Sequence, residues 1–382
     1  MRTVPEKAVT GTGPDRGRPG PGAHAGAASA ASRSHRHYLM ITGPGTAQIA
    51  AEPVRRPRRG QILARSVVSG ISHGTELAWY RGQAPAPHLG WDPVARVYGG
   101  GLPGRGYPVA PGYESVALVE ETGCDVTAVR PGQLVCLDRP HSDLHLISEG
   151  EAAAGLLPDG ADPERAVFVP LARVALGGVH DAAVHVGATV LVTGLGTVGL
   201  LAAQLALRAG AGVVIGIDRF PLRLQAARRL GIRAVMPQVG QDIADVVAEL
   251  AGGGNGVDVA IEASGSYQLL HQAVRSVRAC GRVVTVASYH GDQRGLLLGD
   301  EYHRNRITLV SSMTVNGCTQ RRHSEWNLGR LNAAARDLVL DGTLACSELI
   351  THRFPFTDAQ AAYQLIDSRP GETVKVVLTY AG

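Results

Sequence analysis

Three glycines in the middle of the chain have the spacing that a dinucleotide phosphate requires. Gly194, Gly196 and Gly199 fit G-x-G-x-x-G between a short β-branched run and a helical stretch. The first glycine allows a tight turn, the second lets a pyrophosphate approach the backbone, and the third lets the helix pack close to the strand. The helix N-terminus then directs its free amides at the phosphates. The pattern therefore predicts a dinucleotide site.

Asp218 ends the next predicted strand, where an acidic side chain can bind an adenosine ribose and repel a 2′-phosphate. Arg219 follows it and could bind that phosphate, or stack on adenine. We therefore expect NAD, with NADP as the less favoured alternative. The ends of two later strands, where parallel sheets place their ligands, complete the site. The predicted cofactor-binding residues are Gly194, Leu195, Gly196, Thr197, Val198, Gly199, Asp218, Arg219, Ala263, Ser264, Ala287 and Ser288.

The elements around these residues fall into two patterns. Before about Pro170, short strands lie between glycines and prolines, which predicts a small β-barrel-like domain with strands such as 61–68, 115–120 and 133–137. After it, helices (197–208, 221–230, 242–250, 267–278) alternate with strands (190–192, 213–217, 233–236, 257–261, 282–286, 307–311). This alternation predicts an α/β doubly wound sheet. Helices at 328–340 and 357–366 and a strand at 374–378 are expected to return to the first domain.

Composition bounds the function classes. The 382 residues are 45% hydrophobic, with room for two domains and no apolar run long enough for a membrane span. The net charge of +4 comes largely from the first 60 residues, so no nucleic-acid partner is predicted. Five separated cysteines without a C-x-x-C pair indicate reduced thiols and a cytoplasmic protein.

Two further features concern the ends of the chain. Residues 1–37 are rich in Gly, Pro, Ala, Ser and Arg, and we expect a disordered N-terminal extension without a secretory apolar segment. The only lysines are Lys7 and Lys375. We therefore expect no lysine in the core that could act as a base or a Schiff-base nucleophile.

The whole pattern resembles the medium-chain dehydrogenase/reductase superfamily, which has the zinc alcohol dehydrogenase fold. The likeness spans about 40–382 and rests on VSGISHGTELAWYRG (68–82), VAPGYESVALVEETG (109–123), VRPGQLVCL (129–137), IEASG (261–265) and KVVL (375–378). The resemblance implies a GroES-like β-barrel catalytic domain at 38–169, a Rossmann domain at 170–312 and a return to the catalytic domain at 313–382. It also implies that residues 262–265 and 286–288 flank the nicotinamide.

The chain departs from the zinc-dependent members at all three ligand positions. Their cysteine in G-x-C is Ser72 here, and their histidine in Gly-His-Glu is Tyr113. A third ligand precedes or lies near a Pro-Leu pair, where this chain has Val169. A serine, a tyrosine and a valine do not make a tetrahedral zinc site, and the four-cysteine lobe is missing as well. We therefore predict no metal, and the SHGTE segment resembles the zinc-free branch.

Without zinc, a side chain must take the proton of the alcohol as the hydride leaves. The candidates at the metal position are Tyr113, which could donate to or orient an oxygen, and Ser72 beside it. His73, His141 and Glu114 are the candidate proton acceptors, since histidine titrates in the useful range and a carboxylate can act as a base.

These features favour a zinc-independent, NAD-dependent oxidoreductase that oxidises a secondary alcohol of a polar small molecule, such as a sugar, a cyclitol or another specialised metabolite. Two alternatives remain open. One is an NAD(P)H-dependent reductase of an activated C=C or C=O bond, and the other is a dinucleotide-binding protein with little turnover. The resemblance implies a homodimer, and no membrane partner is predicted.

Overall fold

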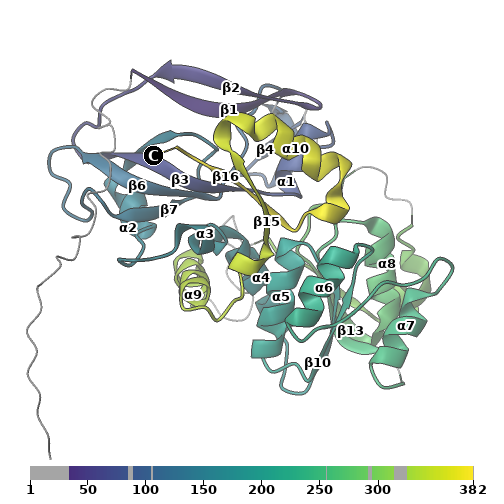
Figure 1. Cartoon of the computed structure of the whole chain (residues 1–382). Coiled ribbons are helices and arrows are strands. Elements are labelled where there is room, and N and C mark those ends of the chain that lie inside the picture. Colours follow the sequence, from purple (N-terminus) through teal and green to yellow (C-terminus); the bar gives the residue numbers. More distant parts are fainter. Residues whose placement is uncertain are drawn as a thin grey trace, which may run out of the picture.

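The computed structural model describes residues 34–84, 89–104, 106–254, 256–290, 295–313 and 325–381. They form two lobes, with β1–β8 and α10 in one and α5–α8 in the other (Figure 1). No described helix is long and apolar enough to cross a membrane. Residues 1–33, most of the predicted extension, lie outside the described part, but β1 begins at His35, before the predicted boundary at 37.

One lobe is a six-stranded parallel sheet in the order β11-β10-β9-β12-β13-β14. Its strands are β9 Thr189–Thr193, β10 Val213–Ile217, β11 Arg233–Val235, β12 Val257–Glu262, β13 Val277–Thr285 and β14 Thr308–Ser311. Its helices are α4 Val169–Ala182, α5 Thr197–Arg208, α6 Pro221–Arg229, α7 Ile243–Leu250 and α8 Tyr267–Ser276. Apolar clusters bury both faces of this sheet. The chain reverses its direction of winding between β9 and β12, where such sheets bind their ligands.

The other lobe is a mixed sheet in the order β15-β16-β3-β6-β7, with β8 also pairing with β3. Its strands are β3 Gln61–Ile71, β6 Ser115–Thr122, β7 Leu134–Leu137, β8 Leu144–Ser148, β15 Ile350–Pro355 and β16 Lys375–Thr379. Two hairpins flank it, β1 His35–Gly43 with β2 Thr46–Pro53 and β4 Leu89–Asp92 with β5 Val97–Pro103. The helices are α1 Thr75–Tyr80, α2 Glu149–Ala154, α3 Pro163–Ala166, α9 Leu328–Leu340 and α10 Ala359–Ser368. The end of the chain thus returns to the mixed sheet of the N-terminal lobe.

Several predicted elements have the observed bounds, among them α5, β10 and α9. Helix α4 was not predicted, because Gly177 and Gly178 give its sequence a low helix propensity. Packing explains Gly178, since a Cβ there would lie 2.3 Å from Cγ1 of Val286. Strand β13 begins at Val277, inside the predicted helix, because α8 ends earlier than its polar pattern suggests.

Candidate active site

The glycine turn after β9 has the geometry that its spacing predicts. Gly194 has φ +85°, and a Cβ there would lie 2.7 Å from the amide nitrogen of Ser264. A Cβ on Gly199 would lie 1.9 Å from the Gly194 carbonyl oxygen, so only glycine lets α5 approach β9 this closely. The nearest heavy atom to a Cβ on Gly196 would be 3.8 Å away, on Arg223. Space is therefore open at Gly196, where α5 presents amides that no side chain caps.

Asp218 lies directly beside this turn and is 7% exposed. Its Oδ2 accepts a hydrogen bond from the Leu195 amide at 2.8 Å, and its Oδ1 accepts one from the Phe220 amide at 2.9 Å. Arg223 lies 3.7 Å from the same carboxylate, and the guanidinium of Arg219 stacks over the Phe220 ring at 4.8 Å. The acid therefore faces the turn, while the neighbouring arginine is held against an aromatic ring.

The buried carboxylate of Glu262 lies at one edge of the parallel sheet, where the turns after β9, β12 and β13 come together. Glu262 accepts hydrogen bonds from the amides of Ser264 and Gly265, and from the hydroxyls of Ser264 and Tyr289. Burial raises its pKa above the usual value. A Cβ on Gly265 would lie 2.7 Å from the Ser288 carbonyl oxygen, which packs the turns after β12 and β13 together. The predicted segments 262–265 and 286–288 therefore meet, and Ser264 also contacts the glycine turn. Glu262 lies within the predicted segment 262–265, but it was not among the named cofactor-binding residues, and Tyr289 was not predicted at all.

The hydroxyls of Ser72 and Tyr113 form a hydrogen bond of 2.7 Å. Ser72 directly follows β3 and Tyr113 directly precedes the β6 region, so the antiparallel pairing of β3 and β6 brings the two residues together. Burial raises the pKa of Tyr113 above its usual value, and the nearby Glu114 charge adds to this rise. The phenol therefore keeps its proton at neutral pH. Val169 begins α4, and Tyr113 packs against the same apolar core that contains Val169.

Glu76 organises a second polar group behind Ser72. It accepts hydrogen bonds from the Ser72 amide at 2.8 Å and from the Tyr363 hydroxyl, and it lies 2.9 Å from Nε2 of His141. The other ring nitrogen of His141 lies 2.7 Å from Oγ of Ser69. His141 is fully buried, and both of its ring nitrogens are engaged, one by Glu76 and the other by Ser69. Neither Glu76 nor Tyr363 was predicted as a site residue, because their partners lie 65 and 287 residues away in the sequence.

His73 has a free ring nitrogen. Its Nε2 is buried and has no hydrogen-bond partner among the described residues. Desolvation lowers its pKa well below the usual value, and the charges of Lys375, Arg223 and Arg81 lower it further. His73 is therefore neutral at physiological pH.

Glu114 forms a fully buried ion pair with Lys375, whose Nζ also donates to the Ile71 carbonyl oxygen at 3.1 Å. The expectation that no lysine lies in the core was wrong. The pairing of β16 with β3 carries this residue of the closing KVVL segment into the interior. Burial raises the pKa of Glu114 to about 7, although Lys375 opposes the rise.

Comparisons with known proteins show the family of this chain. The sequence model described as zinc-binding dehydrogenase matches residues 197–330. D-guloside 3-dehydrogenase of Escherichia coli is 30% identical over 352 residues, which cover 90% of this chain and 99% of that protein. The chain belongs to the medium-chain dehydrogenase/reductase superfamily. It is therefore an oxidoreductase.

Other superfamily members extend the comparison. Sorbitol dehydrogenase 2 of Saccharomyces cerevisiae is 29% identical over 71% of this chain and 82% of its own length. The crystal structure of 2R,3R-butanediol dehydrogenase from Bacillus subtilis has a TM-score of 0.70 at 21% identity, covering 90% of this chain and 99% of that one. The predicted fold class, a GroES-like domain plus a Rossmann domain, is confirmed.

Zinc, which the superfamily commonly binds, does not fit the residues at the corresponding positions. The hydroxyls of Ser72 and Tyr113 satisfy each other, and Val169 is apolar. The adjacent carboxylate, Glu114, already binds the ammonium of Lys375. Within the described ranges, no three His, Cys, Asp or Glu side chains gather as a metal site would need.

Proposed function

We propose that this protein is a zinc-independent, NAD-dependent dehydrogenase that oxidises a secondary alcohol of a sugar or polyol. The names of its relatives, which include a D-guloside 3-dehydrogenase and a sorbitol dehydrogenase, support this substrate class. The hydrogen bond between Ser72 and Tyr113 carries the zinc-independent part of the proposal, because the resemblance places the metal ligands of zinc-dependent superfamily members at these two positions.

Tyr113 orients the reacting oxygen in this proposal. Because its phenol stays protonated, it donates a hydrogen bond to the substrate oxygen, and Ser72 accepts or donates a second one. A donor held in place before the reaction stabilises the negative charge that develops on this oxygen as its proton leaves. The turns at 262–265 and 286–288 would hold the nicotinamide, which would serve as the hydride acceptor.

NAD is the proposed oxidant because Asp218 stands beside the glycine turn and its charge repels a 2′-phosphate. Arg219 would favour NADP if it faced the ribose, but its guanidinium stacks on Phe220. The proposed cofactor site therefore consists of residues 194–199, Asp218 and the two strand-end turns.

The deciding experiment measures zinc per chain, after dialysis without chelator, together with turnover on a panel of polyols and glycosides with NAD or NADP. Near-zero zinc with NAD-dependent alcohol oxidation supports the proposal. About one zinc per chain, with activity lost on chelation and restored by zinc, overturns zinc independence. Reduction of enones or quinones by NADPH without alcohol oxidation would indicate a reductase, and tight dinucleotide binding without turnover would indicate a binding protein.

A further inference from the structure

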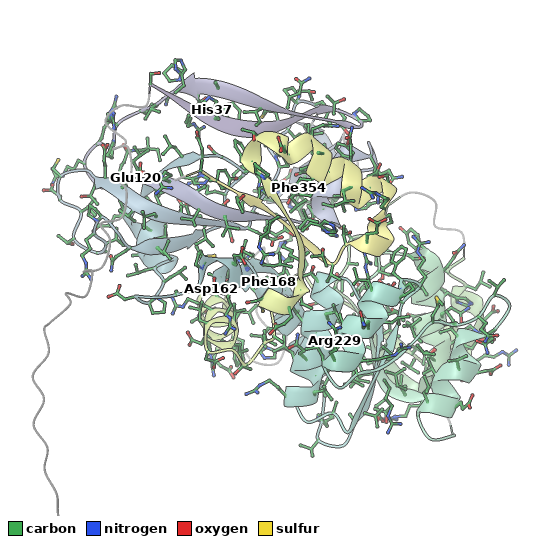
Figure 2. All side chains as sticks on the ribbon, in the orientation of Figure 1. His37, Glu120, Asp162, Phe168, Arg229 and Phe354 are labelled. Carbon is green, nitrogen blue, oxygen red and sulfur yellow. The ribbon has the colours of Figure 1, made fainter. Side chains whose placement is uncertain are left out.

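The buried pair of Glu114 and Lys375 lies where the two lobes meet. Both side chains are fully buried. The Lys375 ammonium lies 6.0 Å from the centre of the Phe168 ring, and Figure 2 labels Phe168 at the junction between the lobes. The two residues are 261 positions apart; Glu114 directly precedes β6, and Lys375 begins β16.

The backbone of β3 is adapted to this pair. A Cβ on Gly70 would lie 2.6 Å from both Oε2 of Glu114 and Nζ of Lys375. The Gly70 amide also donates to the Glu114 carbonyl oxygen at 2.8 Å. Glycine at this position therefore makes room for two charges inside the sheet. A buried ion pair contributes no more stability than apolar residues of similar volume, so folding alone does not account for it.

One oxygen of the pair is left open. Oε2 of Glu114 binds Lys375, but Oε1 is buried without a hydrogen-bond partner among the described residues. A buried acceptor without a donor costs free energy, and such groups often have a chemical role. This oxygen is therefore an acceptor with no donor among the described residues.

The charges around Glu114 come from several elements. Lys375 of β16 and His141 of the loop after β7 favour its ionised form, and Glu76 of α1 disfavours it. Together with burial they set its pKa at about 7, close to the working pH of a cell, where a proton acceptor is most effective. His73, the other open acceptor, has its pKa well below the usual range and is a weaker base.

We propose that Glu114 accepts the proton released when the alcohol is oxidised, and that Lys375 is the positioning residue that keeps Glu114 ionised until then. This inference rests on the proposed function. The C–H bond breaks and its electron pair passes with the hydrogen to the nicotinamide of NAD. The O–H bond breaks, its electrons form the carbonyl bond, and the proton passes to Oε1 of Glu114. The neutral acid then returns this proton to solvent.

Lys375 thus supplies a fixed positive charge without touching the substrate. Its ammonium binds one oxygen of the Glu114 carboxylate and leaves the other free. Glu114 therefore stays ionised at neutral pH and can still accept a proton. Glu114 in turn raises the pKa of Tyr113, which keeps the phenol a donor.

The test compares wild type with the variants E114Q, K375M, K375R and E114Q/K375M. For each, kcat/KM with NAD is measured from about pH 5.5 to about 9, and Tm is measured over the same range. The control is R65M, because Arg65 of β3 and Glu120 of β6 form another ion pair, of 2.7 Å, within the same sheet. H73Q tests the competing acceptor.

We expect wild-type kcat/KM to fall below about pH 7. In K375M the pH below which kcat/KM falls (the acid limb of the profile) should rise by about one unit or more, because Glu114 no longer has a cation beside it. K375R should bring this pH back to the wild-type value. In E114Q and in the double variant, kcat/KM should be lower by about tenfold or more, and it should no longer fall at low pH. R65M should keep the wild-type pH profile.

An unshifted limb in K375M together with full activity in E114Q overturns the proposal, as does a limb that disappears only in H73Q. A wild type that oxidises no alcohol with NAD overturns the proposed function instead. In that case, Tm measurements can still test whether Lys375 stabilises the charge of Glu114. An unpaired, buried Glu114 in K375M should lower Tm more at about pH 8 than at about pH 5.5, and an equal loss at both would show that Lys375 does not hold this charge.

Discussion

At the scale of single residues, the proposed function assigns to the hydroxyls of Ser72 and Tyr113 the hydrogen bonding that would replace a metal. Each is satisfied by the other at rest, at 2.7 Å, and a substrate oxygen would exchange one hydrogen bond for another. Such an exchange costs little in the ground state, so the phenol contributes mainly when charge develops on the substrate.

Tyr113→Phe removes this donor while the ring keeps its packing. We expect kcat to fall about tenfold, roughly 1.4 kcal/mol of barrier, with KM nearly unchanged because the lost hydrogen bond strengthens in the transition state. Steady-state kinetics check this, with Tyr98→Phe on β5 as the control, since Tyr98 is exposed. Unchanged turnover in Tyr113→Phe would remove the phenol from the chemistry.

Asp218→Asn keeps the shape of the side chain and removes its charge. We expect the ratio of kcat/KM with NADP to that with NAD to rise about tenfold, because the repulsion of the 2′-phosphate is lost. Asp245→Asn, an exposed change in the first turn of α7, is the control. A ratio that stays constant would mean that this acid does not select the cofactor.

At the scale of elements, β3 shows how one strand serves both the sheet and the site. Gly70→Ala should lower the free energy of unfolding by about 1–3 kcal/mol, because the new Cβ would meet Glu114 and Lys375 at 2.6 Å. Gly43→Ala in β1 is the matched control, because no heavy atom lies within 4 Å of a Cβ there. Denaturant unfolding measures both, and equal stability of the two variants would contradict the close contact.

The elements whose signals are local could be predicted from the sequence. Periodicity and the three glycines gave the bounds of α5 and the place of the dinucleotide turn. The bracing of Ser72 by Glu76 could not be predicted, because it depends on His141 and Tyr363, which only the tertiary fold brings near. Lys375 was misjudged for the same reason: a single lysine in a terminal strand normally stays in solvent, and its partner is distant in sequence.

At the scale of the whole molecule, stability should depend on pH through His145. This residue is 4% exposed, its Nε2 lies 2.9 Å from Oγ of Ser66, and burial lowers its pKa to about 3. The unfolded chain binds a proton near pH 6.5, and the folded chain does so only near pH 3. Stability is therefore present above about pH 6.5 and falls on acidification, by about 1.4 kcal/mol per pH unit.

His145→Gln should flatten this dependence, which chemical denaturation at pH 5 and pH 8 can measure. Some stability is lost at both pH values with the hydrogen bond to Ser66. His35→Gln, an exposed change in β1, should keep the wild-type slope. An unchanged slope in His145→Gln would place the acid sensitivity in another group.

The position of β16 also bears on how the chain is made. This strand pairs with β3, and Lys375 meets the carbonyl of Ile71, a residue 304 positions earlier. A ribosome that adds ~5–20 residues per second needs roughly 15 to 60 s to cover that distance. During this interval Glu114 lacks the Lys375 ammonium, and residues 68–71 of β3 lack their partner strand β16. The N-terminal lobe therefore stays incomplete until β16 is synthesised, and this one strand then completes both the sheet and its buried charge pair.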